Sequence, residues 1–241
     1  SSSSSSSSGK TTTTSHSSKT KTTSGTAPVD PDAELVDYIK FTMKDIQDTF
    51  QAKFREDGQT YERAKLYIFT DAIGTACGRS SAEIGPFYCP GDNQAYIDLS
   101  FYRDLRQRFG APGDFAQAYV LAHEIGHHIQ NLTGSERRQK RGRNERERNA
   151  ASVRVELQAD CYAGVWGYSA QSRKLLDAGD IEEALTAASA IGDDRLQKQA
   201  GVEVEQETWT HGSSAQRVKW FERGFRTGRL AACDTSQTDD L

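Results

Sequence analysis

The sequence contains no long apolar run, no strong net charge and no internal repeat. No segment reaches the roughly 18 apolar residues that a membrane-spanning helix needs. The net charge is only −4, and no basic stripe with interleaved aromatic residues occurs, so neither nucleic acid nor a lipid surface is expected as the main partner. The lack of a repeat period argues against a solenoid. With 241 residues, of which 35% are hydrophobic, the chain is long enough to bury one sizeable core.

The beginning of the chain lacks large apolar side chains. Its first 26 residues are nearly all Ser and Thr with a few Lys. A segment of this composition cannot bury enough surface to offset the entropy lost on ordering. We therefore expect residues 1–28 to be a disordered tail or linker and residues 29–241 to form the folded domain. Because the chain begins with Ser and not with Met, we also expect it to be a processed or truncated product.

The most specific motif is His123-Glu124-Ile125-Gly126-His127, which matches the pattern HExxH. On a helix, positions i and i+4 lie one above the other, so both imidazoles can reach a single ion, and Glu124 then points toward the open side of that ion. Apolar residues recur at helical spacing before the motif. Asp114 can cap this helix after Pro112-Gly113, and Gly134 can end it.

A five-residue pattern also arises by chance, so a metal site requires a third ligand elsewhere in the chain. Glu156 and Asp160 share one face of a helix-compatible segment. Glu156 would complete a His2Glu set, which is typical of catalytic zinc with its fourth position left for water. Asp160, one turn further on, is placed to accept the second N–H of a ligand imidazole, that of His123. The alternative is two helices that carry ordinary surface acids.

This ligand set predicts hydrolysis supported by one zinc ion per chain. Zinc held by two imidazoles and a carboxylate lowers the pKa of its bound water to about 7. Glu124 is not a ligand and is the expected general base, which takes the proton of the water and passes it to the leaving amine.

Longer stretches of the sequence resemble a known family. They comprise residues 113–116, 122–130, 156–164, 192–196 and 210–217. In this order they resemble the neutral zinc metallopeptidase family of bacteria over most of residues 35–235, and HExxH followed by ExxxD is similar to the gluzincin peptidases. The resemblance implies a zincin-like fold and a zinc metallopeptidase that acts on peptide or protein substrates. Because this family often carries an N-terminal membrane anchor, a signal or anchor upstream of the chain and an extracytoplasmic location are expected.

The same resemblance suggests two further parts of the active site. His211, in the block of residues 210–217, is expected to donate a hydrogen bond to the oxyanion of the tetrahedral intermediate; the alternative is a surface or core histidine. In zincin folds an edge strand beside the HExxH helix binds the substrate backbone, and residues 96–99 are the candidate. The alternative for this strand is a small sheet that only covers the core.

The remaining patterns indicate an α+β domain that is predominantly helical with a small β-sheet. Apolar spacing predicts helices over residues 32–54 and 181–190, and short strands over residues 65–69 and 94–99. Asp193-Asp194 is expected to cap the helix that follows it, with a structural calcium site as the alternative. The basic run of residues 137–148 predicts a solvated, mobile loop, with a lid or a self-cleavage site as the alternatives.

Four cysteines occur without CxxC spacing, so three disulfide pairings are possible. We expect Cys77 to pair with Cys89, across a loop rich in turn residues, and Cys161 to pair with Cys233, which would tie the C-terminal region to the helix of Glu156. Disulfides would place the protein outside the cytoplasm, whereas four buried thiols, the alternative, would favour the cytoplasm.

The function expected from the sequence is therefore a zinc-dependent peptidase, in particular an endopeptidase. Two alternatives are a different zinc hydrolase, acting on amides or on peptidoglycan peptides, and a metal-stabilised binding module without turnover.

Overall fold

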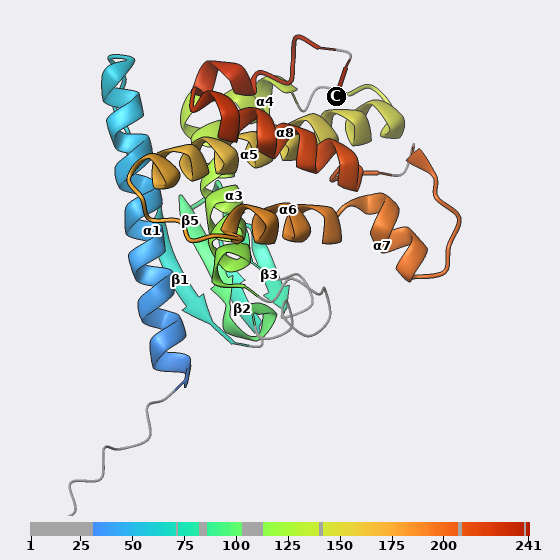
Figure 1. Ribbon diagram of the computed structural model, residues 1–241. Helices are drawn as coiled ribbons and strands as arrows, with labels where there is room; N and C mark the ends of the chain where they lie inside the picture. The colour runs from blue at the N-terminus through green and yellow to red at the C-terminus, as the bar shows by residue number, and fades with distance from the viewer. Residues whose placement is uncertain are drawn as a thin grey trace, which may run out of the picture.

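The computed structural model describes residues 31–70, 72–81, 86–102, 113–139, 142–206, 209–238 and 240–241. The predicted tail of residues 1–28 lies outside the described residues. Within them, the chain is mostly helical, with one three-stranded and one two-stranded sheet (Figure 1). The predicted α+β class with a small sheet is therefore confirmed.

One long helix precedes the strands along the chain, and the other helices follow them. The elements are α1 (Pro31–Glu56), β1 (Lys65–Phe69), β2 (Ala72–Thr75), β3 (Gly78–Ser81), β4 (Phe87–Cys89), β5 (Gln94–Asp98), α3 (Asp114–Thr133), α4 (Ser135–Gln139), α5 (Glu145–Ser172), α6 (Asp180–Ala190), α7 (Asp193–Gln199), α8 (Ser214–Thr227) and the short 3-10 helix η2 (Leu230–Cys233).

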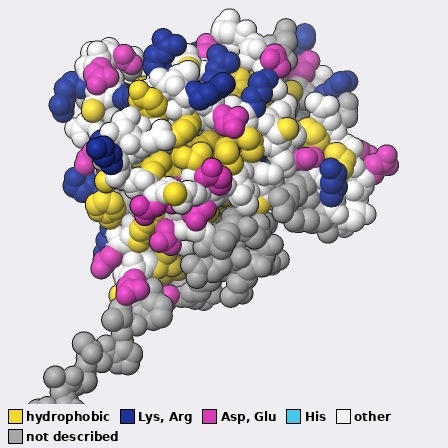
Figure 2. Space-filling model, viewed as in Figure 1, with side chains coloured by type: hydrophobic (Ala, Val, Ile, Leu, Met, Phe, Trp, Pro, Cys, Tyr) yellow, Lys and Arg dark blue, Asp and Glu magenta, His cyan; other side chains and the backbone are white. Residues whose placement is uncertain are grey.

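The helices form the larger part of the core. Figure 1 shows α5 and α8 side by side, with α3 behind them and α1 along one flank of the molecule. Most of the largest fully buried side chains come from α1, α3, α8 and β5; among them are Trp220, Tyr119, Phe50, Phe221, Ile39 and Ile97. On the face shown in Figure 2, most Lys and Arg side chains lie toward the end where α5 and α8 lie, acidic side chains are spread over both ends, and a hydrophobic band crosses the middle.

The three-stranded sheet has the order β1-β5-β4. β5 is parallel to β1, with Tyr67 opposite Tyr96, and antiparallel to β4, with Phe87 opposite Tyr96. β5 is thus the central strand, and the expectation that residues 96–99 form an edge strand is wrong. The segment between β1 and β5, read from the sequence as a loop, contains three short strands, and one of them occupies the open side of β5. Among the described residues β1 and β4 are the two edge strands of this sheet, and β4 is the one that packs beside α3.

The helix with the HExxH motif begins and ends close to the predicted residues. Gly134 ends it in the left-handed conformation, with a φ of 68°, as its lack of a side chain allows. Asp114 is the first helical residue and not the cap, because the N-cap position falls on Gly113, which makes no side-chain cap. The carboxylate of Glu183 on α6 instead accepts the N–H of Phe115 at 3.2 Å, so a neighbouring helix satisfies one of the free N–H groups at this end.

The basic run of residues 137–148 is mostly helical where the structure describes it, so the prediction of a mobile loop is wrong for those residues. Its first part belongs to α4, and its last four residues begin α5. Arginine has a high helix propensity, and Asn144 caps α5 by accepting the N–H of Glu147 at 2.9 Å. Residues 140 and 141 lie outside the described part of the chain.

The four cysteines pair as predicted. Cys77, in the turn of the β2–β3 hairpin, is bonded to Cys89 at the end of β4, and Cys161 of α5 is bonded to Cys233 of η2. The Cα–Cα distances are 5.8 and 5.5 Å, within the usual range. Two disulfides are typical of proteins in oxidising compartments. None of the helices in the described part of the chain is both long and apolar enough to span a bilayer.

Candidate metal centre

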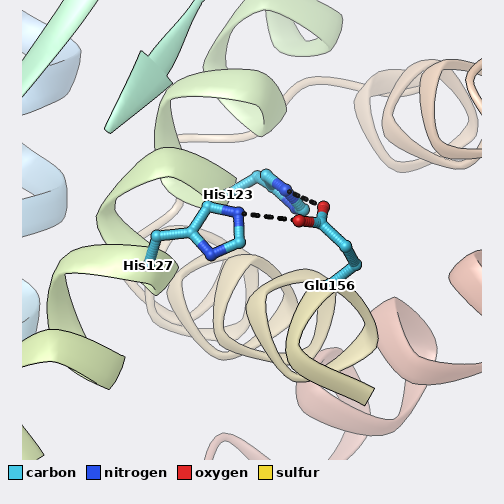
Figure 3. Close-up of side chains that lie close together, drawn as sticks. All are labelled: His123, His127 and Glu156. Atoms are coloured by element: carbon cyan, nitrogen blue, oxygen red, sulfur yellow. Dashed lines mark hydrogen bonds and ion pairs between the residues drawn. The ribbon is translucent and has the colours of Figure 1, made fainter. Parts of the chain in front are cut away.

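Helices α3 and α5 bring the predicted metal ligands together. His123 and His127 project from one face of α3, and Glu156 projects toward them from α5 (Figure 3). The Nε2 atom of His123 lies 3.1 Å from Oε2 of Glu156, and that of His127 lies 3.4 Å from Oε1. One ligand atom from each of the three residues lies within 4.8 Å of the others. This spacing suits donors that share one ion.

A glycine permits this approach of the two helices. Gly126 lies between the two histidines in the sequence and faces α5. A Cβ atom at this position would lie only 2.9 Å from both the Cα and the carbonyl oxygen of Ala159. Any side chain at this position would therefore push α3 away from α5, and Glu156 away from the imidazoles.

The chemistry of the donor set fits zinc. Each imidazole hydrogen-bonds a side chain through Nδ1, so its Nε2 atom is the one that faces Glu156. The partner of His123 is Asp160, with an Nδ1–Oδ1 distance of 2.8 Å, as the sequence predicted. The partner of His127 is Gln130, with an Nδ1–Oε1 distance of 2.9 Å. Two imidazoles and a carboxylate, with the second nitrogens held in this way, are the ligand set of a catalytic zinc site.

Asp160 is completely buried and has three partners. Arg217 of α8 donates from Nε to Oδ2 at 2.9 Å and from Nη2 to Oδ1 at 3.0 Å, and the hydroxyl of Tyr119 donates a short hydrogen bond to Oδ1. Burial raises the pKa of Asp160, but Arg217 and His123 together hold it below its usual value. Asp160 is thus a buried carboxylate that stays ionised beside His123.

Sequence reasoning missed the role of Arg217, whose side chain is only 3% exposed. A signal was available in the periodicity of α8. Residues 217, 220, 221 and 224 lie on one face of that helix, and the other three are Trp, Phe and Gly. An arginine on an otherwise apolar helix face needs a buried acid, and Asp160 provides it.

Glu124 is buried next to the three candidate ligands, with 8% of its surface exposed. Burial raises the pKa of its carboxyl group, and the neighbouring His127 and His123 partly oppose this effect. The pKa of Glu156 is shifted the other way: burial raises it, but the two imidazoles lower it more, to well below the usual value. Two glutamates at one site are therefore held in chemically different states, which is a pattern found in catalytic centres.

A cavity of about 410 Å³ opens onto this cluster. Its walls are formed by Pro86, Phe87, Tyr88, Pro90, Phe101, Tyr119, Val120, His123, Glu124, His127, Glu136, Val155, Glu156, Ile191, Leu196, His211 and Arg217. The edge strand β4 forms one wall, and the helices form the others. A cavity of this size, mostly apolar with a few converging polar atoms, is suited to hold part of an extended substrate.

His211 lies on the wall of the same cavity, and half of its side chain is exposed. Its Nδ1 atom is 3.2 Å from Oδ1 of Asp193. Oδ2 of Asp193 accepts the backbone N–H groups of Thr210, His211 and Gly212 at 2.7 to 2.9 Å. The hydrogen bond with Asp193 raises the pKa of His211, against the opposing effect of burial.

The sequence predicted that Asp193-Asp194 caps the helix that follows it, and this prediction is wrong. Both residues lie in the first turn of α7, whose N-cap is Gly192. Asp193 orders the turn that carries His211, and Asp194 accepts from the backbone N–H and the hydroxyl of Ser214, at 2.7 and 2.9 Å, at the start of α8. The two carboxylates thus accept hydrogen bonds from residues 210–214.

His128, next to the second ligand, belongs to the packing and not to the metal cluster. It is completely buried, with Nδ1 2.8 Å from the hydroxyl of Tyr88 and Nε2 2.6 Å from the carbonyl of Glu62. Tyr88 is a residue of β4, so His128 connects the HExxH helix to the edge strand that lines the cavity.

Comparisons with known proteins agree with this arrangement. The chain matches the model of a family described as "Putative neutral zinc metallopeptidase" over residues 3–236. It is similar to the uncharacterized protein YpfJ of Escherichia coli K12, with 48% identity over 205 residues, which cover 84% of this chain and 71% of that protein. It is also similar to the uncharacterized protein Rv2575 of Mycobacterium tuberculosis H37Rv, with 47% identity over 192 residues, 75% of this chain and 65% of that protein. No solved structure matches the chain. The chain belongs to the family described as putative neutral zinc metallopeptidases.

Proposed function

We propose that this protein is a zinc-dependent endopeptidase in which His123, His127 and Glu156 hold one zinc ion per chain. The observation that carries the proposal is the convergence of these three donors on one cavity that also contains Glu124. A bound zinc ion would lower the pKa of a water molecule and polarise the carbonyl group of the substrate.

Glu124 is the general base of the proposed reaction. It follows a ligand directly in the sequence but is not one of the three converging donors. Its raised pKa suits a group that accepts a proton from water and then gives it to the leaving amine, because a base with a very low pKa holds a proton poorly. Burial also keeps bulk water from competing for this proton.

His211 is the proposed donor to the developing oxyanion. It lines the same cavity as the α3 ligands, and Asp193 holds both its imidazole and its backbone. The raised pKa of His211 favours the protonated form, in which both ring nitrogens can donate. Such a donor stabilises charge that appears only in the transition state.

The edge strand β4 is the proposed binding site for the substrate backbone. We infer a zincin-like arrangement in which β4, in place of the central strand β5, lies along the cavity beside the HExxH helix. Phe87 and Tyr88 of β4 contribute to the cavity wall, and the outer side of β4 has no strand partner among the described residues. An extended peptide can bind there through main-chain hydrogen bonds.

We further propose that residues 29–241 act as one peptidase domain and that this domain works outside the cytoplasm. The two disulfides support this location because the cytoplasm keeps thiols reduced.

A digest of internally quenched peptides that are blocked at both ends tests the function. We expect cleavage by the zinc-loaded protein, loss of cleavage with a chelator and its return with added zinc. The variant Glu124→Gln should retain zinc and lose cleavage by at least about 100-fold, the usual size of a general-base contribution. Glu222→Gln, at an exposed glutamate of α8, is the control and should behave as the parent.

Three other results would contradict the proposal. Chelator-sensitive hydrolysis of peptidoglycan fragments but not of peptides would indicate a different zinc hydrolase. Stoichiometric zinc without turnover of either substrate would indicate a binding module. Full activity of Glu124→Gln would remove Glu124 from the mechanism.

A further inference from the structure

We propose that Gln130 and Gln158 form a buried pair of amides that fixes the tautomer of His127, and that the backbone carbonyl of Cys233 sets the direction of this pair. The inference rests on the proposed zinc site but concerns residues that the proposed function does not use. Gln130 has 0% exposure and Gln158 has 4%. A glutamine buried to this degree must have its donors and acceptors satisfied by the protein.

The amide of Gln130 can point in only one direction. Its Nε2 atom donates to the carbonyl of Val155 at 2.7 Å and to Oε1 of Gln158 at 3.0 Å. If the amide were rotated by 180°, its oxygen would face two acceptors in a buried environment, and both hydrogen bonds would be replaced by repulsion. Oε1 of Gln130 must therefore face His127.

Gln158 is held in the same way from its far end. Its Nε2 atom donates to the carbonyl of Cys233 at 2.9 Å. Its Oε1 atom accepts from Gln130, from the hydroxyl of Ser135 at 2.7 Å and from Nε2 of Gln139 at 3.1 Å. A carbonyl group can only accept, so Cys233 sets the direction of the Gln158 amide, and Gln158 in turn supports that of Gln130.

The direction of these hydrogen bonds determines which nitrogen of His127 carries the proton. Since Oε1 of Gln130 can only accept, Nδ1 of His127 must be the N–H group. The lone pair of the neutral ring then lies on Nε2, the atom that faces Glu156. Whenever the ring is neutral, His127 is thus held in the tautomer whose free nitrogen can bind a metal, which reduces the cost of binding.

Methionine substitutions at three buried glutamines test this inference. Gln130→Met and Gln158→Met remove the pair with little change in volume. Gln47→Met is the matched control: Gln47 is 4% exposed and also makes three hydrogen bonds, but these go to Tyr61 and Ala64, away from the metal centre. Zinc affinity is measured by competition with a chromophoric chelator on protein freed of metal.

We expect zinc affinity to fall about 10- to 100-fold in Gln130→Met, as is usual when the hydrogen-bond partner of a ligand histidine is lost. Gln158→Met should give a smaller loss, because Gln130 stays in place but its amide is less constrained. Gln47→Met should lower stability without changing affinity. In proton–nitrogen NMR spectra of the zinc-loaded protein, the Nδ1 proton of His127 should exchange slowly with solvent in the parent and rapidly in Gln130→Met.

Parental affinity in both Gln130→Met and Gln158→Met would overturn the inference, as would an Nδ1 proton that exchanges equally slowly in the parent and Gln130→Met. If Gln130→Met does not fold, the affinity of Gln158→Met and its His127 proton decide the question alone. These failures are distinct from failure of the proposed function. A parent protein that takes up no zinc would overturn both, whereas a zinc-binding parent that cleaves no peptide would leave this inference standing.

Discussion

The two imidazoles that face Glu156 are oriented by chemically different surroundings. His123 donates to Asp160, a buried carboxylate whose charge is balanced by Arg217. His127 donates to Gln130, a neutral amide in a chain of neutral hydrogen bonds. A carboxylate makes an imidazole a more basic ligand than an amide does. The same metal would therefore be held by one more basic and one less basic imidazole. Different substitutions would disturb the orientation of each.

The partners of the two histidines also come from different parts of the chain. Arg217 reaches Asp160 from α8, which packs closely on α5: a Cβ at Gly164 would lie 2.0 Å from the carbonyl oxygen of Phe221. Gln130 belongs to α3 itself, one turn after His127. The orientation of His123 by Asp160 and Arg217 thus depends on the packing of α8. The orientation of His127 by Gln130 depends on α3, α5 and the segment around Cys233. Substitutions at Glu156, Arg217 and Asp193 perturb these surroundings to different degrees.

Glu156→Ala removes the carboxylate that faces both imidazoles, and this variant should no longer bind zinc stoichiometrically. The reason is that two histidines alone leave the ion with only two protein ligands, where a catalytic site has three. Elemental analysis after dialysis measures the result, with the exposed Glu222→Ala as the control for loss of a helical glutamate. Zinc content equal to that of the parent would show that another residue is the third ligand.

Arg217→Met should cost more stability than Gln130→Met. Removing the arginine leaves Asp160 as a buried charge without its cation, a change that typically costs about 3–5 kcal/mol. Removing the amide leaves Nδ1 of His127 unpaired, at about 1–3 kcal/mol, because Oε1 of Gln158 keeps its bonds to Ser135 and Gln139 and the carbonyl of Val155 lies within α5. Denaturant unfolding of the metal-free variants compares the two free energies. Equal losses would mean that Asp160 takes up a proton in the variant and so escapes the cost of its charge.

Asp193→Asn should have a smaller effect, because His211 is half exposed and water screens the interaction. Asp193 raises the pKa of His211 in the folded protein, so the interaction stabilises the fold fully below about pH 6.5, the unfolded value, and is lost as pH rises through the folded value. If His211 acts in protonated form, the alkaline limb of kcat/KM should move to lower pH in Asp193→Asn. An unchanged profile would remove His211 from the reaction.

The parts of the site that local spacing determines could be predicted from the sequence. His123 and His127 lie four residues apart on a helix, and Glu156 and Asp160 repeat that spacing on a second one, so their directions follow from helix geometry alone. The disulfide between Cys77 and Cys89 was predictable because turn residues close the short loop between them. Helices α1, α3, α5 and α6 were equally predictable from apolar periodicity, whereas α8 carries such a pattern but was not predicted.

What depends on tertiary pairing could not be predicted in this way. β4 has only three residues and lies within a segment read as a loop, so its place at the edge of the sheet is visible only once β5 has two neighbours. Arg217 meets Asp160 across 57 residues, and Gln158 meets Cys233 across 75. Such pairings are decided by how helices pack, and local patterns of the sequence do not show which residues meet.

Because the hydrogen-bond chain to His127 ends at the carbonyl of Cys233, the orientation of His127 depends on a residue near the end of the chain. Every proposed ligand is synthesised well before Cys233, yet the order of the amides that end at His127 depends on that late residue, which the bond to Cys161 keeps in place. A nascent chain, or one whose sulfurs are still reduced, would carry the complete ligand set without its final alignment. In the proposed metal site, the alignment of His127 would then be completed last, after the bond between Cys161 and Cys233 has formed.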